Sequence, residues 1–102
     1  MDLRDMRYVV AIAQNGTVTK AAEQLHLSQS TLSLTYRALE KELGVPLFRK
    51  KGRNLLLTEA GRLFCREAAS ILAQTELLRT RMEQYGSALQ KSITLYTDAV
   101  DF

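Results

Sequence analysis

Apolar residues recur at helical spacing in three consecutive segments at the start of the chain. Residues 3–15 are predicted to form the first helix, with its apolar stripe at Leu3, Met6, Val10 and Ala13 and with Val9 beside the stripe. The second helix is predicted to begin after Thr17, with a stripe at Val18, Ala21, Ala22 and Leu25. The third is predicted over residues 28–43, with a stripe at Leu32, Tyr36, Leu39 and Leu43. The spacing of the last two helices predicts a helix-turn-helix over residues 18–37.

The outer side of the third predicted helix is rich in hydroxyl groups at its N-terminal end. Ser28 is a favourable N-cap, and Ser30, Ser33, Leu34 and Arg37 fall on or beside the face opposite the apolar stripe. Free backbone amides and the helix dipole favour anions at a helix N-terminus. Short hydroxyls, an amide and an arginine are therefore displayed where a negatively charged ligand could bind.

Residues 47–57 predict a small β-hairpin. Two short extended segments flank the sequence KKGR. The tip contains no acidic residue and consists of Arg49, Lys50, Lys51, Gly52 and Arg53. A basic run of this kind is most often a solvated turn. Because this one directly follows the second helix of the predicted helix-turn-helix, whose outer face could bind an anion, it predicts a wing that contacts phosphates or a narrow minor groove.

A heptad pattern predicts a long helix that begins after Thr58, its N-cap, and runs to about Gly86. Apolar steps of four and three alternate through Phe64, Ala68, Ile71, Thr75, Leu78, Met82 and Tyr85, and Leu72 widens the stripe. The pattern predicts that this helix pairs with a second helix, although it could also fold back on its own domain. After it, Ile93 and Leu95 alternate with polar neighbours, which predicts one strand.

Length and charge narrow the class of protein. The chain has 102 residues, enough for one small domain and an extension, and its net charge is +3. Residues 1–57 carry nine Lys/Arg and five Asp/Glu, whereas residues 58–102 carry five and six. The basic surplus lies in the first part, as a nucleic-acid footprint requires. Because no signal-peptide core or membrane-spanning run is present, we expect a soluble, cytoplasmic protein without a membrane partner.

The sequence offers little for catalysis or metal binding. Cys65 is the only cysteine, so no intrachain disulfide can form, and no histidine is placed to activate its thiol. His26 has no second metal ligand at suitable spacing, the carboxylates are scattered, and no Gly-rich phosphate loop is present. We therefore expect no enzyme activity, no metal and no cofactor.

Over residues 1–87 the chain resembles the N-terminal part of LysR-type transcriptional regulators. The resemblance rests on three motifs in the family's order and spacing: AAEQLHLSQ (21–29), LSLTYRALEKELGVPLFRK (32–50) and GRNLLLTEAG (52–61). It implies a mainly α fold, in which a winged helix-turn-helix over residues 1–58 is followed by a long dimerisation helix over residues 59–87. That winged domain would comprise three helices and a small β-hairpin wing. It also implies that residues 88–102 begin an effector-binding domain that is truncated here.

The expected function is sequence-specific DNA binding by a dimeric bacterial transcriptional regulator. Helix 28–43 would lie in the major groove of an inverted-repeat operator, with wing 49–53 on the minor groove or backbone. The candidate DNA-binding residues are Lys20, Ser28, Gln29, Ser30, Thr31, Ser33, Leu34, Arg37, Lys50, Lys51 and Arg53. The candidate dimer-interface residues are Phe64, Ala68, Ile71, Leu72, Thr75, Leu78, Met82 and Tyr85. A tetramer and a small-molecule effector are expected only for the full-length regulator with its C-terminal domain.

Two positions depart from the family's pattern. Ser30 stands where the family usually has proline, which is pre-organised for the first helical turn, so Ser30 gives up rigidity and gains a hydrogen-bond donor. Leu34 stands where the family often has a basic residue. A leucine cannot bind phosphate or guanine, but it could cover a thymine methyl group.

A rival interpretation comes from another class of protein. In that interpretation the chain is a helical coiled-coil module for protein interaction, and its basic patch is incidental. A salt titration distinguishes the two interpretations. Phosphate contacts make DNA affinity fall steeply with salt concentration, so only the DNA-binding interpretation predicts that fall.

Overall fold

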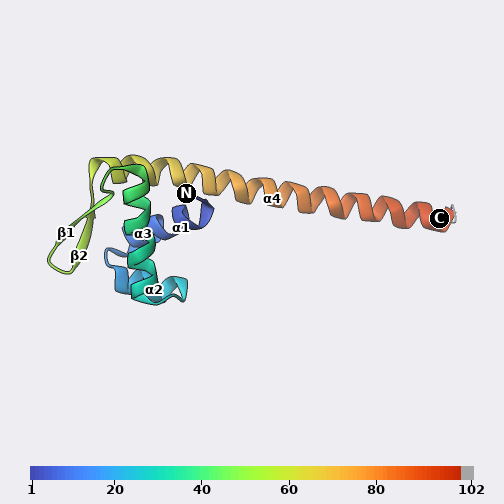
Figure 1. The fold of residues 1–102 in the computed structure, drawn as a ribbon. Helices are drawn as coiled ribbons and strands as arrows, with labels where there is room; N and C mark the ends of the chain where they lie inside the picture. The colour runs from blue at the N-terminus through green and yellow to red at the C-terminus, as the bar shows by residue number, and fades with distance from the viewer. Residues whose placement is uncertain (100–102) are drawn as a thin grey trace. The chain divides into compact units, whose positions relative to one another are not determined.

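The structure is a computed structural model that describes the backbone of residues 1–99 and the side chains of residues 1–92. Three helices precede a two-stranded hairpin and a long fourth helix, as the sequence predicted (Figure 1). In chain order the elements are α1 (Leu3–Asn15), α2 (Val18–Leu25), α3 (Gln29–Leu43), β1 (Phe48–Lys51), β2 (Asn54–Leu57) and α4 (Glu59–Ala99). The chain divides into two compact units, Met1–Leu72 and Ala73–Phe102.

The boundaries of α2 and α3 are set by hydroxyl caps and left-handed residues. The Thr17 side chain accepts a hydrogen bond from the Lys20 amide, and the Ser28 side chain accepts one from the Thr31 amide. Both caps satisfy a backbone donor that has no partner within the helix. The turn between the two helices is made at His26, whose φ is 57°. These caps confirm the predicted starts of both helices.

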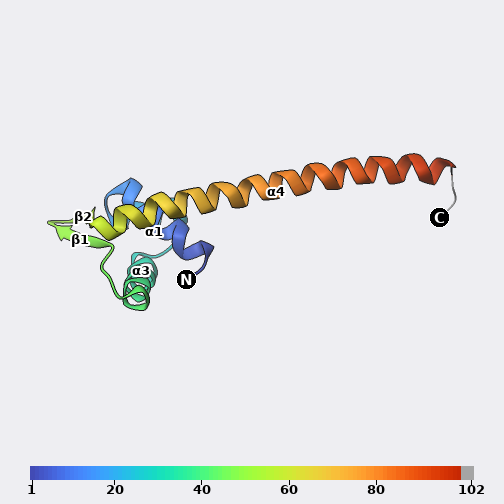
Figure 2. The same ribbon diagram turned by 90° about the horizontal axis from the view of Figure 1, so that it is seen from above.

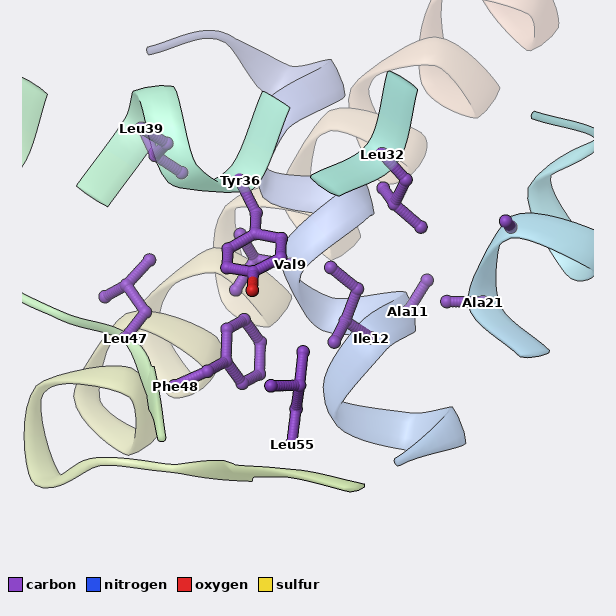
Figure 3. Packing of buried hydrophobic residues seen from close by; sticks show 11 residues of the cluster. Val9, Ala11, Ile12, Ala21, Leu32, Tyr36, Leu39, Leu47, Phe48 and Leu55 are labelled. Carbon is purple, nitrogen blue, oxygen red and sulfur yellow. The ribbon is translucent and has the colours of Figure 1, made fainter. Parts of the chain in front are cut away.

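The core of the first unit lies between α1, α2, α3 and the hairpin. Buried side chains from all four point toward one another (Figure 3). The side chains with less than 2% exposure and the largest volumes are Val9, Ile12, Leu32 and Leu47. The Tyr36 and Phe48 rings meet edge to face, with centroids 5.5 Å apart and planes inclined by 78°. The hairpin is therefore packed directly onto α3.

The predicted stripe of α1 was centred on the wrong face. Val9 and Ile12 are fully buried, whereas Met6 and Val10 are only partly buried. Residues 8–13 read YVVAIA and are apolar on every side, so periodicity alone could not choose the buried face. That choice comes from tertiary packing, because α1 contacts α2, α3 and β2 together.

The hairpin has the predicted position and a tight antiparallel register. Phe48 faces Leu57 at its open end, and Lys51 faces Asn54 next to the turn. Gly52 occupies the turn with a φ of 64°, a left-handed conformation that favours glycine in two-residue hairpin loops. The Leu55 amide donates to the Gly16 carbonyl at 2.9 Å, which attaches the hairpin to the turn between α1 and α2.

The first turns of α4 are fastened to the segment before β1. Thr58 caps the helix as predicted, because its Oγ1 accepts from the Gly61 amide at 3.0 Å and donates to the Pro46 carbonyl at 2.7 Å. The Thr58 amide donates to the Leu47 carbonyl at 3.0 Å. A Cβ at Gly61 would overlap that same Leu47 carbonyl oxygen. Close backbone approach therefore requires glycine at this position.

The helix α4 does not end near Gly86, and the predicted strand at residues 93–96 was wrong. The described residues are helical through Ala99 (Figure 2), and residues 100–102 lie outside them. A glycine inside a helix costs only about 1 kcal/mol relative to alanine. A strand needs a neighbouring strand for its backbone hydrogen bonds, and the two strands described here pair with each other. A helix satisfies those bonds within the segment itself.

Candidate nucleic-acid interface

The helix α3 has one face that is buried in the core and an opposite face that is exposed to solvent. Its buried residues are Leu32, Tyr36 and Leu39. On the other side Gln29, Ser30, Thr31, Leu34 and Arg37 are exposed, and Ser33 is partly exposed. The side chains expected to contact DNA on this helix are thus accessible, and its apolar residues hold it against the core.

The hydroxyl of Ser28 is already used within the helix cap. It accepts from the Thr31 amide at 3.1 Å and donates to the Thr31 Oγ1 at 2.8 Å. A hydroxyl has one proton, so Ser28 has none left for a phosphate while this pair is intact. Thr31 keeps its own hydroxyl proton, which makes it the better phosphate donor of the two.

Arg37 is held at the border between the core and the outer face. Its guanidinium carbon lies 5.9 Å from the centroid of the Tyr36 ring. A cation placed over an aromatic face is stabilised by about 0.5–1 kcal/mol at exposed sites. The Tyr36 ring also packs against Phe48 of β1, so Arg37, Tyr36 and the wing are in contact in that order.

A cleft of about 320 Å³ lies between the start of α2, the middle of α3 and the wing. It is lined by Thr17, Val18, Thr19, Ser33, Tyr36, Arg37, Lys50, Gly52, Arg53 and Leu55. Three of these residues are cationic and three carry small hydroxyl groups, and none of the described lining residues is acidic. Such a set of donors suits an anion of phosphate type. Lys20 is exposed on α2, directly after the lining residue Thr19.

The cations of the wing do not all belong to this cleft. Lys50 and Arg53 line it, whereas Lys51 is exposed but is not part of its lining. Successive residues of a strand point to opposite faces, so Lys50 and Lys51 present their charges on different sides of the wing. The predicted basic tip is thus divided between two surfaces.

Sequence reasoning missed Glu40, which joins the recognition helix to the wing. Its Oε2 accepts from the Leu47 amide at 2.6 Å and from the Phe48 amide at 3.2 Å. These bonds fix the start of β1 relative to α3. No spacing rule connects a helical carboxylate to amides seven and eight residues later, so this contact could not be predicted from the sequence.

Within the first unit, the predicted dimer residues of α4 differ in exposure. Ala68 is 3% exposed and Phe64 packs against the core, whereas Ile71 remains 40% exposed. A groove of about 370 Å³ lies beside them, with Met6 and Leu43 among its walls. Ala68 is therefore already covered by its own domain, whereas Ile71 keeps a large part of its surface exposed.

Within the second unit, an apolar row of α4 is open to solvent. Leu78, Met82 and Tyr85 are exposed by 60%, 58% and 68%. Leu89 continues the row and is 50% exposed, although it was not predicted. The step of four from Tyr85 to Leu89 continues the heptad pattern, but it lies beyond Gly86, where the sequence predicted the helix to end.

Other kinds of site have little support in the described part of the chain. No group of three or more His, Cys, Asp or Glu residues there could hold a metal ion. Among the same residues, no helix combines the length and apolar character needed to cross a bilayer. Burial raises the pKa of the Cys65 thiol, which disfavours the reactive thiolate.

Known proteins resemble this chain in both sequence and fold. Two relatives from Escherichia coli K-12 are the Hca operon transcriptional activator HcaR, 47% identical over 79% of this chain, and the DNA-binding transcriptional dual regulator OxyR, 38% identical over 87%. The aligned segments cover 27% of HcaR and 29% of OxyR, so the chain spans less than a third of these relatives.

Solved structures match the winged fold together with part of the long helix. A CbnR_DBD–DNA complex has a TM-score of 0.79 at 34% identity, covering 84% of this chain and 99% of that one. A BenM_DBD complex with catB site 1 DNA has a TM-score of 0.83 at 32% identity, covering 85% and 97%. Residues 3–62 match the family described as "Bacterial regulatory helix-turn-helix protein, lysR family". Because that match covers more than half of the residues, the chain belongs to the lysR family of bacterial regulatory proteins.

Proposed function

We propose that this chain is the dimeric, sequence-specific DNA-binding module of a transcriptional regulator. In this proposal α3 lies in the major groove, with Gln29, Ser30, Ser33 and Leu34 toward base edges. The phosphate contacts come from Lys20, Thr31, Arg37, Lys50, Lys51 and Arg53, with the wing on the minor groove or backbone. Ser28 contributes by capping α3.

The observation that carries the proposal is the cleft between α2, α3 and the wing. It gathers Arg37, Lys50 and Arg53 from two separate elements, and none of the described residues that line it is acidic. The similar CbnR_DBD and BenM_DBD structures were both solved with DNA. The protein-interaction alternative is not favoured, because it gives this cleft no role.

A salt titration of DNA binding tests the proposal. Each phosphate contact adds about 0.9 to the slope of log affinity against log salt concentration. We expect a steep fall in affinity between about 50 and 200 mM salt, and a slope reduced by about one for Arg37→Ala. Arg81→Ala removes an exposed arginine from α4 and serves as the matched control, with an unchanged slope expected. Affinity that is independent of salt would contradict the proposal.

The wing has a separate expected signature. Arg53→Ala should weaken binding to operator and to unrelated DNA by similar factors, because contacts to phosphate and groove width carry little base information. Gln29→Ala should instead affect one base pair, by about 1–3 kcal/mol. A loss in Arg53→Ala that is confined to one operator would contradict the assignment of the wing.

The second part of the proposal is that two copies pair through the exposed row of α4. Full burial of a large apolar side chain is worth roughly 1.5–3 kcal/mol, and Leu78, Met82, Tyr85 and Leu89 are each at least half exposed. A second copy supplies an identical row, so their pairing is self-complementary in a two-fold dimer. The same pairing provides two copies of α3, as an inverted-repeat operator requires.

Two neighbouring leucines of α4 allow a matched test of this pairing. Leu77 is 49% exposed but lies about 100° around the helix from Leu78, off the apolar row. We expect the wild type and Leu77→Asp to sediment as dimers at micromolar concentration, and Leu78→Asp to sediment as a monomer. A monomeric wild type would contradict the proposed pairing.

The remaining expectations concern the whole regulator. We propose that residues 1–58 form the DNA-binding domain, that residues 59–87 form the linker, and that residues 88–102 begin an effector-binding domain. Effector binding and tetramer formation would then belong to the longer chain. A non-enzymatic role agrees with the relatives, which are named as transcriptional regulators. A cytoplasmic location follows from the proposed DNA partner.

A further inference from the structure

The first two turns of α3 present a base-reading surface without charge. Residues 29–36 read QSTLSLTY and contain no Lys, Arg, Asp or Glu. The nearest cation on the helix is Arg37, which is held beside the Tyr36 ring. The other cations of the interface come from α2 and the wing. Cationic side chains therefore flank the base-reading surface of α3, but none lies within residues 29–36.

Leu34 occupies the middle of this surface. At 70% exposure it is the most exposed large hydrophobic side chain that the structure describes. Its helical neighbours at four residues before and after, Ser30 and Ala38, are exposed as well. By helical geometry Leu34 lies about 160° around the helix from both Leu32 and Tyr36. It borders an open hollow of about 360 Å³ beside Met1 and Asp5. Because 70% of the side chain is still exposed, contacts within the domain leave most of this leucine uncovered.

The chemistry of Leu34 restricts what it can recognise in a major groove. Guanine is read by paired donors to its O6 and N7, and cytosine is read by an acceptor for its amino group. A leucine offers neither a donor nor an acceptor. Thymine is the one base that presents an apolar group there, its 5-methyl, and apolar side chains contact it.

Resting on the proposed DNA-binding function, we propose that Leu34 is a specificity-determining residue that recognises a thymine through its 5-methyl group. The contact buries apolar surface on both partners and displaces no counterion. It therefore adds to the preference for the operator without changing the salt dependence of binding.

Deoxyuridine isolates the proposed contact, because it differs from thymine only by lacking the methyl group. An operator is first selected from randomised duplexes with the wild-type chain, and each thymine of one half-site is then replaced singly by deoxyuridine. One replacement should weaken wild-type binding by about fourfold, the factor expected for the burial of one methyl-sized group. The same replacement should have no effect on Leu34→Ala, which keeps the helix because alanine is a strong helix former.

Leu77→Ala provides the matched control, because it truncates another exposed leucine outside α3. It should retain the full sensitivity to deoxyuridine. If every replacement is neutral for the wild type, or if the loss persists in Leu34→Ala, the role of Leu34 is wrong although DNA binding stands. Selection that enriches no sequence also overturns it. Failure of the wild type to bind duplex DNA would instead reject the proposed function itself.

Discussion

The two units of this chain follow the same helical periodicity, yet only one of them buries its apolar residues. In the first unit packing buries the stripe of α3 at Leu32, Tyr36 and Leu39, and Leu43 at its end is 39% exposed. In the second unit the row of α4 is as regular, and Leu78 is 60% exposed. The comparison shows that periodicity identifies a face that favours burial, but it does not identify what covers that face.

The largest expected effect distinguishes a buried side chain of the first unit from an exposed side chain of the second. Leu32→Ala should lower the free energy of unfolding by about 2–5 kcal/mol, because it leaves a cavity between packed elements. Leu77→Ala on the exposed surface of α4 should change it by less than about 0.5 kcal/mol. Denaturant unfolding measures both, and a comparable loss for the two variants would contradict the division between packed and open regions.

Two glycines of α4 allow the same comparison of packed and open surroundings to be made at the backbone. Gly61→Ala should destabilise the first unit by about 1–3 kcal/mol, because its Cβ would overlap the Leu47 carbonyl. Gly86→Ala meets no atom within 4 Å and should stabilise α4 by about 0.5–1 kcal/mol. Thermal unfolding measures the first change, and amide hydrogen exchange along α4 measures the second. Faster exchange in Gly86→Ala would indicate that the helix ends there after all.

Glu40 tests whether the wing is held in place by α3. Glu40→Ala leaves the Leu47 and Phe48 amides without their acceptor and should cost about 1 kcal/mol of stability. Removal of a carboxylate alone raises DNA affinity by reducing repulsion, so Glu23→Ala, on the surface of α2, provides the baseline. Relative to that baseline we expect Glu40→Ala to bind DNA more weakly in a mobility-shift titration. Equal affinity in the two variants would remove Glu40 from the interface.

The smallest expected effect concerns the thiol of the first unit. Burial raises the pKa of Cys65, so at pH 8 less thiolate is present than in the unfolded chain. Alkylation in native buffer should therefore be several-fold slower than in urea. A cysteine introduced as Leu77→Cys in a Cys65→Ser background should react at similar rates under both conditions. If native buffer slows the alkylation of both thiols equally, the proposed difference in burial between the two units is wrong.

Most of the first unit could be predicted from local signals. Thr17, Ser28 and Thr58 cap the predicted helices, and the glycine of the basic tip occupies the predicted turn. These features depend on residues close together in the sequence. The buried face of α1 could not be predicted, because Ile12 lies in a segment that is apolar all round.

The candidate interface was predictable only in part, for the same physical reason. The exposed residues of α3 follow from helical geometry, and the cations of the wing follow from the hairpin. Two hydrogen bonds could not be predicted, because periodicity does not determine side-chain geometry. They are the bond from the Ser28 hydroxyl to Thr31 and the bond from the Leu47 amide to Glu40. Leu89 lies beyond the predicted helix end at Gly86, although the heptad step of four from Tyr85 continues to it.

The central claim is that the first unit binds DNA while the second pairs two copies for an inverted repeat. Its most direct test measures the affinities of the wild type and Leu78→Asp for the selected inverted repeat and for a single half-site at one ionic strength. We expect the wild type to prefer the inverted repeat strongly, whereas Leu78→Asp should lose that preference and retain half-site affinity. An unchanged preference in Leu78→Asp, or a wild type that binds both duplexes equally, would contradict it.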